Sequence, residues 1–185
     1  GGAVDDGDEQ VTFASAVADP CRTRLGAGAS RTPADALAAA AIREFWEETG
    51  LVLGRPGAWP SAPPLNWNGF AAQRMFPMAA PLHFVFRAVT PPGRPRRFDA
   101  RFFLCDAAHI HGDLDDFSNA DGELHNLQWV PFTQVNALDI AFITELVLAE
   151  ISKTLPKIGP PDAVPYLRNS DEQALFERIR SPRKG

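Results

Sequence analysis

The sequence lacks several features that would place the protein in a specialised class. Its 185 residues contain no run close to the roughly 20 apolar residues that a membrane-spanning helix needs. They begin without a charged-then-apolar leader. Only two cysteines occur, Cys21 and Cys105, which are too few for a disulfide framework or a zinc knuckle. We therefore expect a protein of the cytoplasm with no membrane partner.

An excess of basic charge is also missing. The formal net charge is −5, which argues against a protein whose main role is to coat nucleic acid, so no nucleic-acid partner is expected. Apolar residues make up 45% of the chain and charged residues 22%, which is ordinary for a globular domain. The length fits one domain, or one domain with an appendage.

The residue pattern predicts a mixture of helices and strands, in an α+β or layered α/β arrangement. An alanine-rich segment that starts at Pro33 and stops at Gly50 is typical of a helix. Alternating apolar residues indicate strands, and an apolar stripe indicates a second long helix. The proline- and glycine-rich segment 54–81 is expected to be mainly loop. The predicted elements are helices over 33–49, 133–151 and 171–180, and strands over 82–89, 98–104 and 124–132.

Three glutamates occur within five residues near the end of the first predicted helix. Glu44, Glu47 and Glu48 fall within about a 100° arc of one helix face. Arg43 can pair with Glu47 but cannot neutralise all three carboxylates. Oxygen ligands clustered in this way suit a hard divalent cation such as Mg²⁺ or Mn²⁺, which can polarise a phosphoryl oxygen and activate a water. The alternative is an ordinary solvated helix face.

The segment Arg43-Glu-Phe-Trp-Glu-Glu-Thr-Gly-Leu51 resembles the core of the Nudix hydrolase signature, Arg-Glu-hydrophobic-x-Glu-Glu-x-Gly-hydrophobic, at every fixed position. A chance match in a chain of this length is on the order of 10⁻⁵. The resemblance implies the Nudix fold, an α/β/α sandwich with a mixed sheet flanked by helices. It implies that Glu44, Glu47 and Glu48 bind the metal and that one of them, Glu44 in the first place, orients or deprotonates a water. Arg43 would hold Glu47 in place.

The upstream part of the signature matches only if the motif is split. At the usual spacing, Ala29 and Asp35 stand where a glycine and a glutamate are expected. The opening Gly1–Asp8 instead resembles the family's Gly-Gly-x-x-Glu-x-Gly-Glu, with Gly2 as the glycine whose carbonyl helps to bind metal and Asp8 as the acid. Residues 9–32 would then be an insertion. The alternative is a loose terminus unrelated to the site.

A second block, Thr90-Pro to Arg96-Arg-Phe-Asp-Ala-Arg-Phe-Phe103, resembles a segment of the Nudix enzymes related to peroxisomal coenzyme A diphosphatases, with Ala100 in place of the usual threonine. Guanidinium groups suit bidentate phosphate contact, so Arg96, Arg97 and Arg101 are candidates for substrate binding. A hairpin tip kept soluble by charge is the alternative, as is an Arg101 that pairs with an acid. Glu123 is, by its spacing, the candidate for one more metal ligand or base, and otherwise a loop acid.

The aromatic residues of the 54–81 segment have two readings. Trp59, Trp67 and Phe70 could stack on a base or line an acyl pocket, but we expect them to be buried anchors of the loop.

The resemblance implies a Nudix domain over 1–155, without the strand that usually precedes the motif, and a tail over 156–185 that contains the short helix. It implies a Mg²⁺- or Mn²⁺-dependent enzyme that hydrolyses the diphosphate bond of a nucleotide-type small molecule. Coenzyme A or an acyl-coenzyme A is the first expectation, and ADP-ribose or a dinucleotide is the alternative. A Nudix-fold nucleotide sensor without catalysis is a further alternative, which the presence of all three glutamates disfavours. A homodimer is left open.

Overall fold

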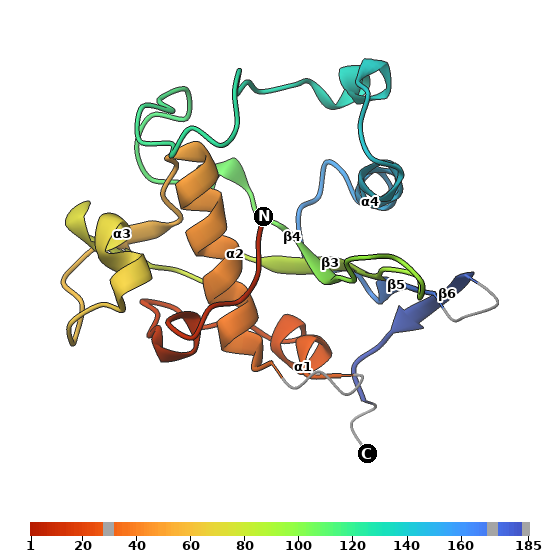
Figure 1. Cartoon of the computed structure of the whole chain (residues 1–185), viewed down its shortest axis with the longest axis horizontal. Helices are drawn as coiled ribbons and strands as arrows, with labels where there is room; N and C mark the ends of the chain where they lie inside the picture. The colour runs from red at the N-terminus through yellow and green to blue at the C-terminus, as the bar shows by residue number, and fades with distance from the viewer. Residues whose placement is uncertain (28–31, 170–173, 183–185) are drawn as a thin grey trace. The chain divides into compact units, whose positions relative to one another are not determined.

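The computed structural model describes residues 1–27, 32–169 and 174–182 (Figure 1). The chain forms two compact units, each built from two stretches of sequence. The first unit contains Gly1–Leu82 and Cys105–Trp129, and the second contains His83–Leu104 and Val130–Gly185. Helices occur with a mixed four-strand sheet and an antiparallel strand pair, so the predicted α+β class is confirmed. Within these residues, no helix combines the length and the apolar character needed to cross a membrane.

The first unit is organised around helix α2, Ala34–Thr49. Its alanine-rich first half favours helix, and one side of it, including Leu37, Ala38 and Ile42, is buried. Gly50 ends the helix with a φ of 74°, in the left-handed region that glycine adopts at low cost. The helix predicted over 33–49 is therefore confirmed, with its first turn one residue later.

Short elements surround α2 in this unit. The segment predicted to be an insertion contains the α-helix α1, and its residues Val11, Val17 and Leu25 are buried, so it contributes to the core. The segment 54–81 is mainly loop, as predicted, but its ends pair as two short antiparallel strands. The elements are η1 Asp8–Gln10, α1 Cys21–Leu25, β1 Gly54–Pro56, η2 Leu65–Trp67, α3 Asn68–Ala72, β2 Met75–Pro77 and η3 Ala107–His109.

The second unit is a four-strand sheet with the order β4-β3-β5-β6. Strands β3, His83–Val89, and β4, Asp99–Leu104, form the predicted antiparallel hairpin. Strand β5, Val164–Asn169, runs parallel to β3, and β6, Ala174–Ile179, pairs antiparallel with β5. Helix α4, Phe142–Ser152, packs Val147 and Ile151 against Val85 and Phe86 of β3 to form the core of this unit.

Three predicted elements are wrong or altered. Residues 124–132 form no strand; Leu124 and Trp129 are exposed, and the Trp129 indole donates to the Leu114 carbonyl at 2.9 Å instead. The helix predicted over 133–151 is divided into η4, Phe132–Ala137, and α4, because the backbone is extended between them. The helix predicted over 171–180 is a strand in its described part, since pairing with β5 satisfies the backbone of β6 and overrides local propensity.

Candidate functional site

Arg43 lies at the centre of the glutamate cluster on α2. Its side chain is only 5% exposed, and its Nη1 donates to the carboxylates of Glu44 and Glu47 at 2.7 and 2.8 Å. The predicted contact between Arg43 and Glu47 is therefore present, and the same nitrogen also holds Glu44.

Asp8 binds the other side of the Arg43 guanidinium. It is 1% exposed and accepts from Nε and Nη2 of Arg43, each at 3.0 Å, in a bidentate arrangement. The Trp67 indole and the Asp5 backbone N–H also donate to Asp8, both at 2.9 Å. Burial alone would lower the pKa of Arg43, but the bonds to Asp8 and the two glutamates outweigh it and hold that pKa above its ordinary value. The ion pairs thus compensate the burial of the Arg43 charge.

The N-terminal segment lies along α2 and reaches the glutamates (Figure 1). The backbone of Gly2 is against Glu44: a Cβ added there would overlap both carboxylate oxygens. The amino nitrogen of Gly1 pairs with Glu48. Residue 2 can therefore approach Glu44 this closely only as glycine. The chain start is thus brought to Glu44 and Glu48, which lie more than 40 residues further along the sequence.

Glu47 differs electrostatically from an ordinary surface glutamate. Its pKa is raised, first by burial and then by the neighbouring carboxylates of Glu44 and Asp121, and Arg43 offsets this only in part. Asp121 is held at the end of α2 because its N–H donates to the Glu47 carbonyl at 2.8 Å. The loop it belongs to packs closely on Gly50, where an added Cβ would lie 2.8 Å from the Ala120 nitrogen.

Asp121 is a residue of this site that the sequence analysis missed. The spacing argument selected Glu123, which is exposed and whose N–H donates to the Asp121 carboxylate at 2.9 Å. The turn Asp121-Gly-Glu123 could have been recognised, since an aspartate often accepts from the backbone two residues later, but the contact with Glu47 is long-range and has no local signal. The loop thus brings Asp121 close to Glu47, while Glu123 stays a predicted ligand.

The oxygen ligands of the candidate site suit a hard divalent cation in their chemistry and, in part, in their placement. Glu44, Glu47, Glu48 and the Gly2 carbonyl offer oxygen only, which is the ligand type that Mg²⁺ and Mn²⁺ prefer. The space that a side chain at position 2 would fill is taken by the Glu44 carboxylate, which places the Gly2 backbone beside this ligand. Across the described ranges, however, no three His, Cys, Asp or Glu side chains form a ready metal cage. Here Arg43 holds Glu44 and Glu47, and the Gly1 nitrogen pairs with Glu48.

The candidate substrate arginines belong to the second unit. Arg96 and Arg97 are exposed in the turn between β3 and β4. The Arg101 side chain is 8% exposed and pairs with Asp99 at 3.1 Å. This outcome matches the alternative that Arg101 pairs with an acid.

Asp99 also pairs with Arg87 at 2.8 Å, and the Arg87 guanidinium lies over the Tyr166 ring. Burial alone would raise the pKa of Asp99, but the two guanidinium groups outweigh it and lower that pKa. For Arg101 burial is the larger influence, so its pKa is lowered. The strand ends next to the turn therefore carry an ion-pair cluster in which the two arginine side chains are buried and Asp99 is partly exposed, and Arg96 and Arg97 in the turn itself are exposed to solvent.

The aromatic residues of the 54–81 segment are anchors, as predicted. Trp67 and Phe70 are completely buried, and their ring centroids are 5.3 Å apart. Phe70 contacts Trp46 of α2 edge-on at 6.1 Å, and Trp59 is 5.8 Å from Trp67. This aromatic cluster packs η2 and α3 onto the glutamate helix.

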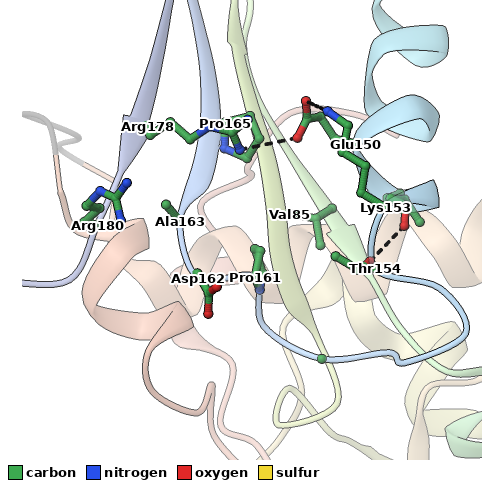
Figure 2. A pocket seen from close by; sticks show the side chains of 12 residues that line it. Val85, Glu150, Lys153, Thr154, Pro161, Asp162, Ala163, Pro165, Arg178 and Arg180 are labelled. Carbon is green, nitrogen blue, oxygen red and sulfur yellow. Dashed lines mark hydrogen bonds and ion pairs between the residues drawn. The ribbon is translucent and has the colours of Figure 1, made fainter.

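Each unit also has a cavity. The cavity in the first unit, about 220 Å³, begins at the end of α2 and is lined by Gly50, His111, Asp113 and Asn119 among others. The cavity in the second unit, about 370 Å³, lies between α4, β3 and the β5–β6 pair (Figure 2). On its rim Glu150 pairs with both Lys153 and Arg178, so part of its charge is compensated internally.

Comparison with family models, with curated proteins and with solved structures finds no match for this chain.

Proposed function

We propose that this chain is a Nudix-type hydrolase that uses Mg²⁺ or Mn²⁺ to cleave a diphosphate bond, in a domain of the Nudix fold. One observation carries the proposal: the two halves of the split motif meet. Gly2 lies against Glu44, and Asp8 binds Arg43, although residues 9–32 separate the halves in sequence. A loose terminus would not be expected to bury an acid on the arginine of the glutamate helix.

A bound Mg²⁺ or Mn²⁺ would polarise a phosphoryl oxygen and lower the pKa of a water. In the proposal Glu44, Glu47, Glu48 and the Gly2 carbonyl hold it. Arg43 keeps Glu44 and Glu47 in place and shares one nitrogen between them, so the second oxygen of each carboxylate is left for the cation.

The reaction then needs one glutamate to orient or deprotonate the water, and we assign this role to Glu44, whose second oxygen would turn from the cation to the water in this step. The water oxygen forms a bond to one phosphorus, and the bridging P–O bond breaks with its electron pair left on the departing phosphate. Asp121 lies close enough to Glu47 to act on it electrostatically and is a further candidate, beside Glu123, for the acid of this loop.

The proposed substrate is coenzyme A or an acyl-coenzyme A, which would yield 3′,5′-ADP and a phosphopantetheine product. The exposed Arg96 and Arg97 support a substrate with a phosphate beyond the diphosphate, because guanidinium groups bind phosphate in a bidentate way. Arg101 pairs with Asp99, so in the proposal it stabilises the hairpin that carries Arg96 and Arg97.

The test is hydrolysis of a panel of compounds by the whole chain with Mg²⁺ and with Mn²⁺, with products identified by mass. The panel contains coenzyme A, acyl-coenzyme A, ADP-ribose, NADH and diadenosine polyphosphates. Glu48→Gln should lower the metal-dependent rate by about 10²-fold or more, since it removes a charge that binds the cation. Glu145→Gln is the matched control, because Glu145 is an exposed helical glutamate of the second unit, and it should keep the full rate.

Selective cleavage of ADP-ribose would refute coenzyme A as the substrate but would leave the proposed diphosphate hydrolysis in place. Tight nucleotide binding without turnover by the unaltered chain would refute the proposal of an enzyme and favour a nucleotide sensor without catalysis.

A further inference from the structure

The Arg43 guanidinium uses all of its donors. Its five N–H groups bond to Asp8 twice, to the Ala3 carbonyl, to Glu44 and to Glu47. Since the guanidinium is planar and its donors have a fixed fork geometry, the two bonds to Asp8 fix the direction of Nη1. The placement of Glu44 and Glu47 therefore depends on how firmly Asp8 is held.

Asp8 is held by four donors, two on each oxygen. One oxygen accepts from Nε of Arg43 and from the Trp67 indole, and the other from Nη2 of Arg43 and the Asp5 N–H. Among these donors only Trp67 lies outside both halves of the motif. It belongs to η2, in a segment with no counterpart in the motif, and is completely buried, so water cannot replace its N–H.

We infer that Trp67 is a positioning residue for the carboxylate site, which acts through Asp8 and Arg43 on Glu44 and Glu47. The inference rests on the proposed function, because the site it positions is the proposed metal site. The indole N–H prevents the Asp8 carboxylate from rotating, the carboxylate fixes the guanidinium plane, and Nη1 holds the two glutamates with one oxygen each free for a cation. A residue of the loop segment 54–81 thus sets the geometry of a site on α2.

The test compares Trp67→Phe with Trp59→Phe in the whole chain. Trp59 is a matched control because it belongs to the same aromatic cluster and also donates its indole N–H, to the Met75 carbonyl at 2.9 Å, but has no bond to Asp8. Both variants replace an indole by a smaller phenyl ring and lose its N–H donor, which is buried in Trp67 and partly buried in Trp59. Only Trp67→Phe removes a bond of the Asp8–Arg43 pair.

Two readouts report positioning without turnover. Mn²⁺ affinity, measured from the spin-resonance signal of free Mn²⁺, should fall about three- to tenfold in Trp67→Phe. This is less than the 10–100-fold typical of direct partners of metal ligands, because Trp67 acts one bond further away. The side-chain Nε–H of Arg43, followed by NMR, should exchange with solvent faster in Trp67→Phe. Neither quantity should change in Trp59→Phe.

Equal changes in the two variants, or no change in Trp67→Phe, overturn the inference and leave the proposed function in place. If Glu48→Gln binds Mn²⁺ as tightly as the unaltered chain, the proposed function fails and the positioning role fails with it. Faster exchange at Arg43 in Trp67→Phe would then still report the loss of the bond to Asp8. Should Trp67→Phe not fold, β-(3-benzothienyl)alanine at position 67 keeps the ring size and lacks only the N–H, and the same expectations apply.

Discussion

The most demanding prediction concerns the stability of Asp8→Asn. Asp8 is 1% exposed and makes a bidentate pair with the equally buried Arg43. The asparagine side chain fits the same space, but its NH₂ group takes the place of one carboxylate oxygen. That NH₂ group would face two N–H donors, one from Arg43 and one from either Trp67 or Asp5, which accept nothing. The buried guanidinium then also loses its main counter-charge.

Breaking a buried ion pair by removing one partner costs about 3–5 kcal/mol, and we expect about 3 kcal/mol here because one acceptor oxygen remains. A change of ~3 kcal/mol lowers the ratio of folded to unfolded chain by a factor above about 100. Urea unfolding followed by tryptophan fluorescence measures it. The slope with urea should stay constant, since the surface exposed on unfolding does not change.

Asp35→Asn is the control for this prediction. Asp35 also makes a bidentate pair, with Arg22 at 2.6 and 2.7 Å, but both side chains are more than a third exposed. Exposed pairs contribute about 0–1 kcal/mol. If the two asparagine variants lose the same free energy of unfolding, burial is not what makes the Asp8–Arg43 pair important, and the reasoning about the site is refuted.

Two further predictions concern one position in each unit. Gly2→Ala should weaken Mn²⁺ binding about tenfold or more, because the added Cβ displaces the Glu44 carboxylate. The free energy of unfolding should stay within about 1 kcal/mol, because Gly2 is exposed. Calorimetric titration measures the Mn²⁺ affinity, and an unchanged affinity would contradict the prediction. Asp99→Asn should destabilise the chain by about 1 kcal/mol at pH 7, a figure discounted for the partial exposure of Asp99. Because the folded pKa of Asp99 lies below its ordinary value of 3.8, the contribution is complete above pH 3.8 and is lost as the pH falls below it. Urea unfolding at pH 7 and near pH 3 should therefore show the gap between Asp99→Asn and the unaltered chain closing, and a gap that persists in acid would contradict the assignment.

Local signals were sufficient for the elements that depend on neighbouring residues. The alanine run and Gly50 define α2, apolar alternation over 82–89 indicates β3, and the proline-glycine turn after it indicates the returning strand β4. Local signals failed where a distant partner decides the structure. Residues 174–179 form a strand because β5 is beside them, and residues 124–132 do not form one in the absence of such a partner.

The site shows the same division between local and distant contacts. The glutamates share one helix face by spacing alone, so their proximity to Arg43 could be predicted. The bond between Asp8 and Arg43 spans 35 residues and that between Asp8 and Trp67 spans 59, and no local pattern encodes either. Splitting the motif predicted that Gly2 and Asp8 belong near the helix; Trp67 and Asp121 had no such guide.

The parallel pairing of β3 with β5 has a consequence for how the chain is made. Arg87 pairs with Tyr166, so about 80 further residues must leave the ribosome before β3 gains this neighbour. Until then one edge of β3 is a row of unpaired backbone groups that another nascent chain could pair with. We therefore expect chains that stop early, near residue 155, to aggregate during synthesis even though every residue of the glutamate helix is already present.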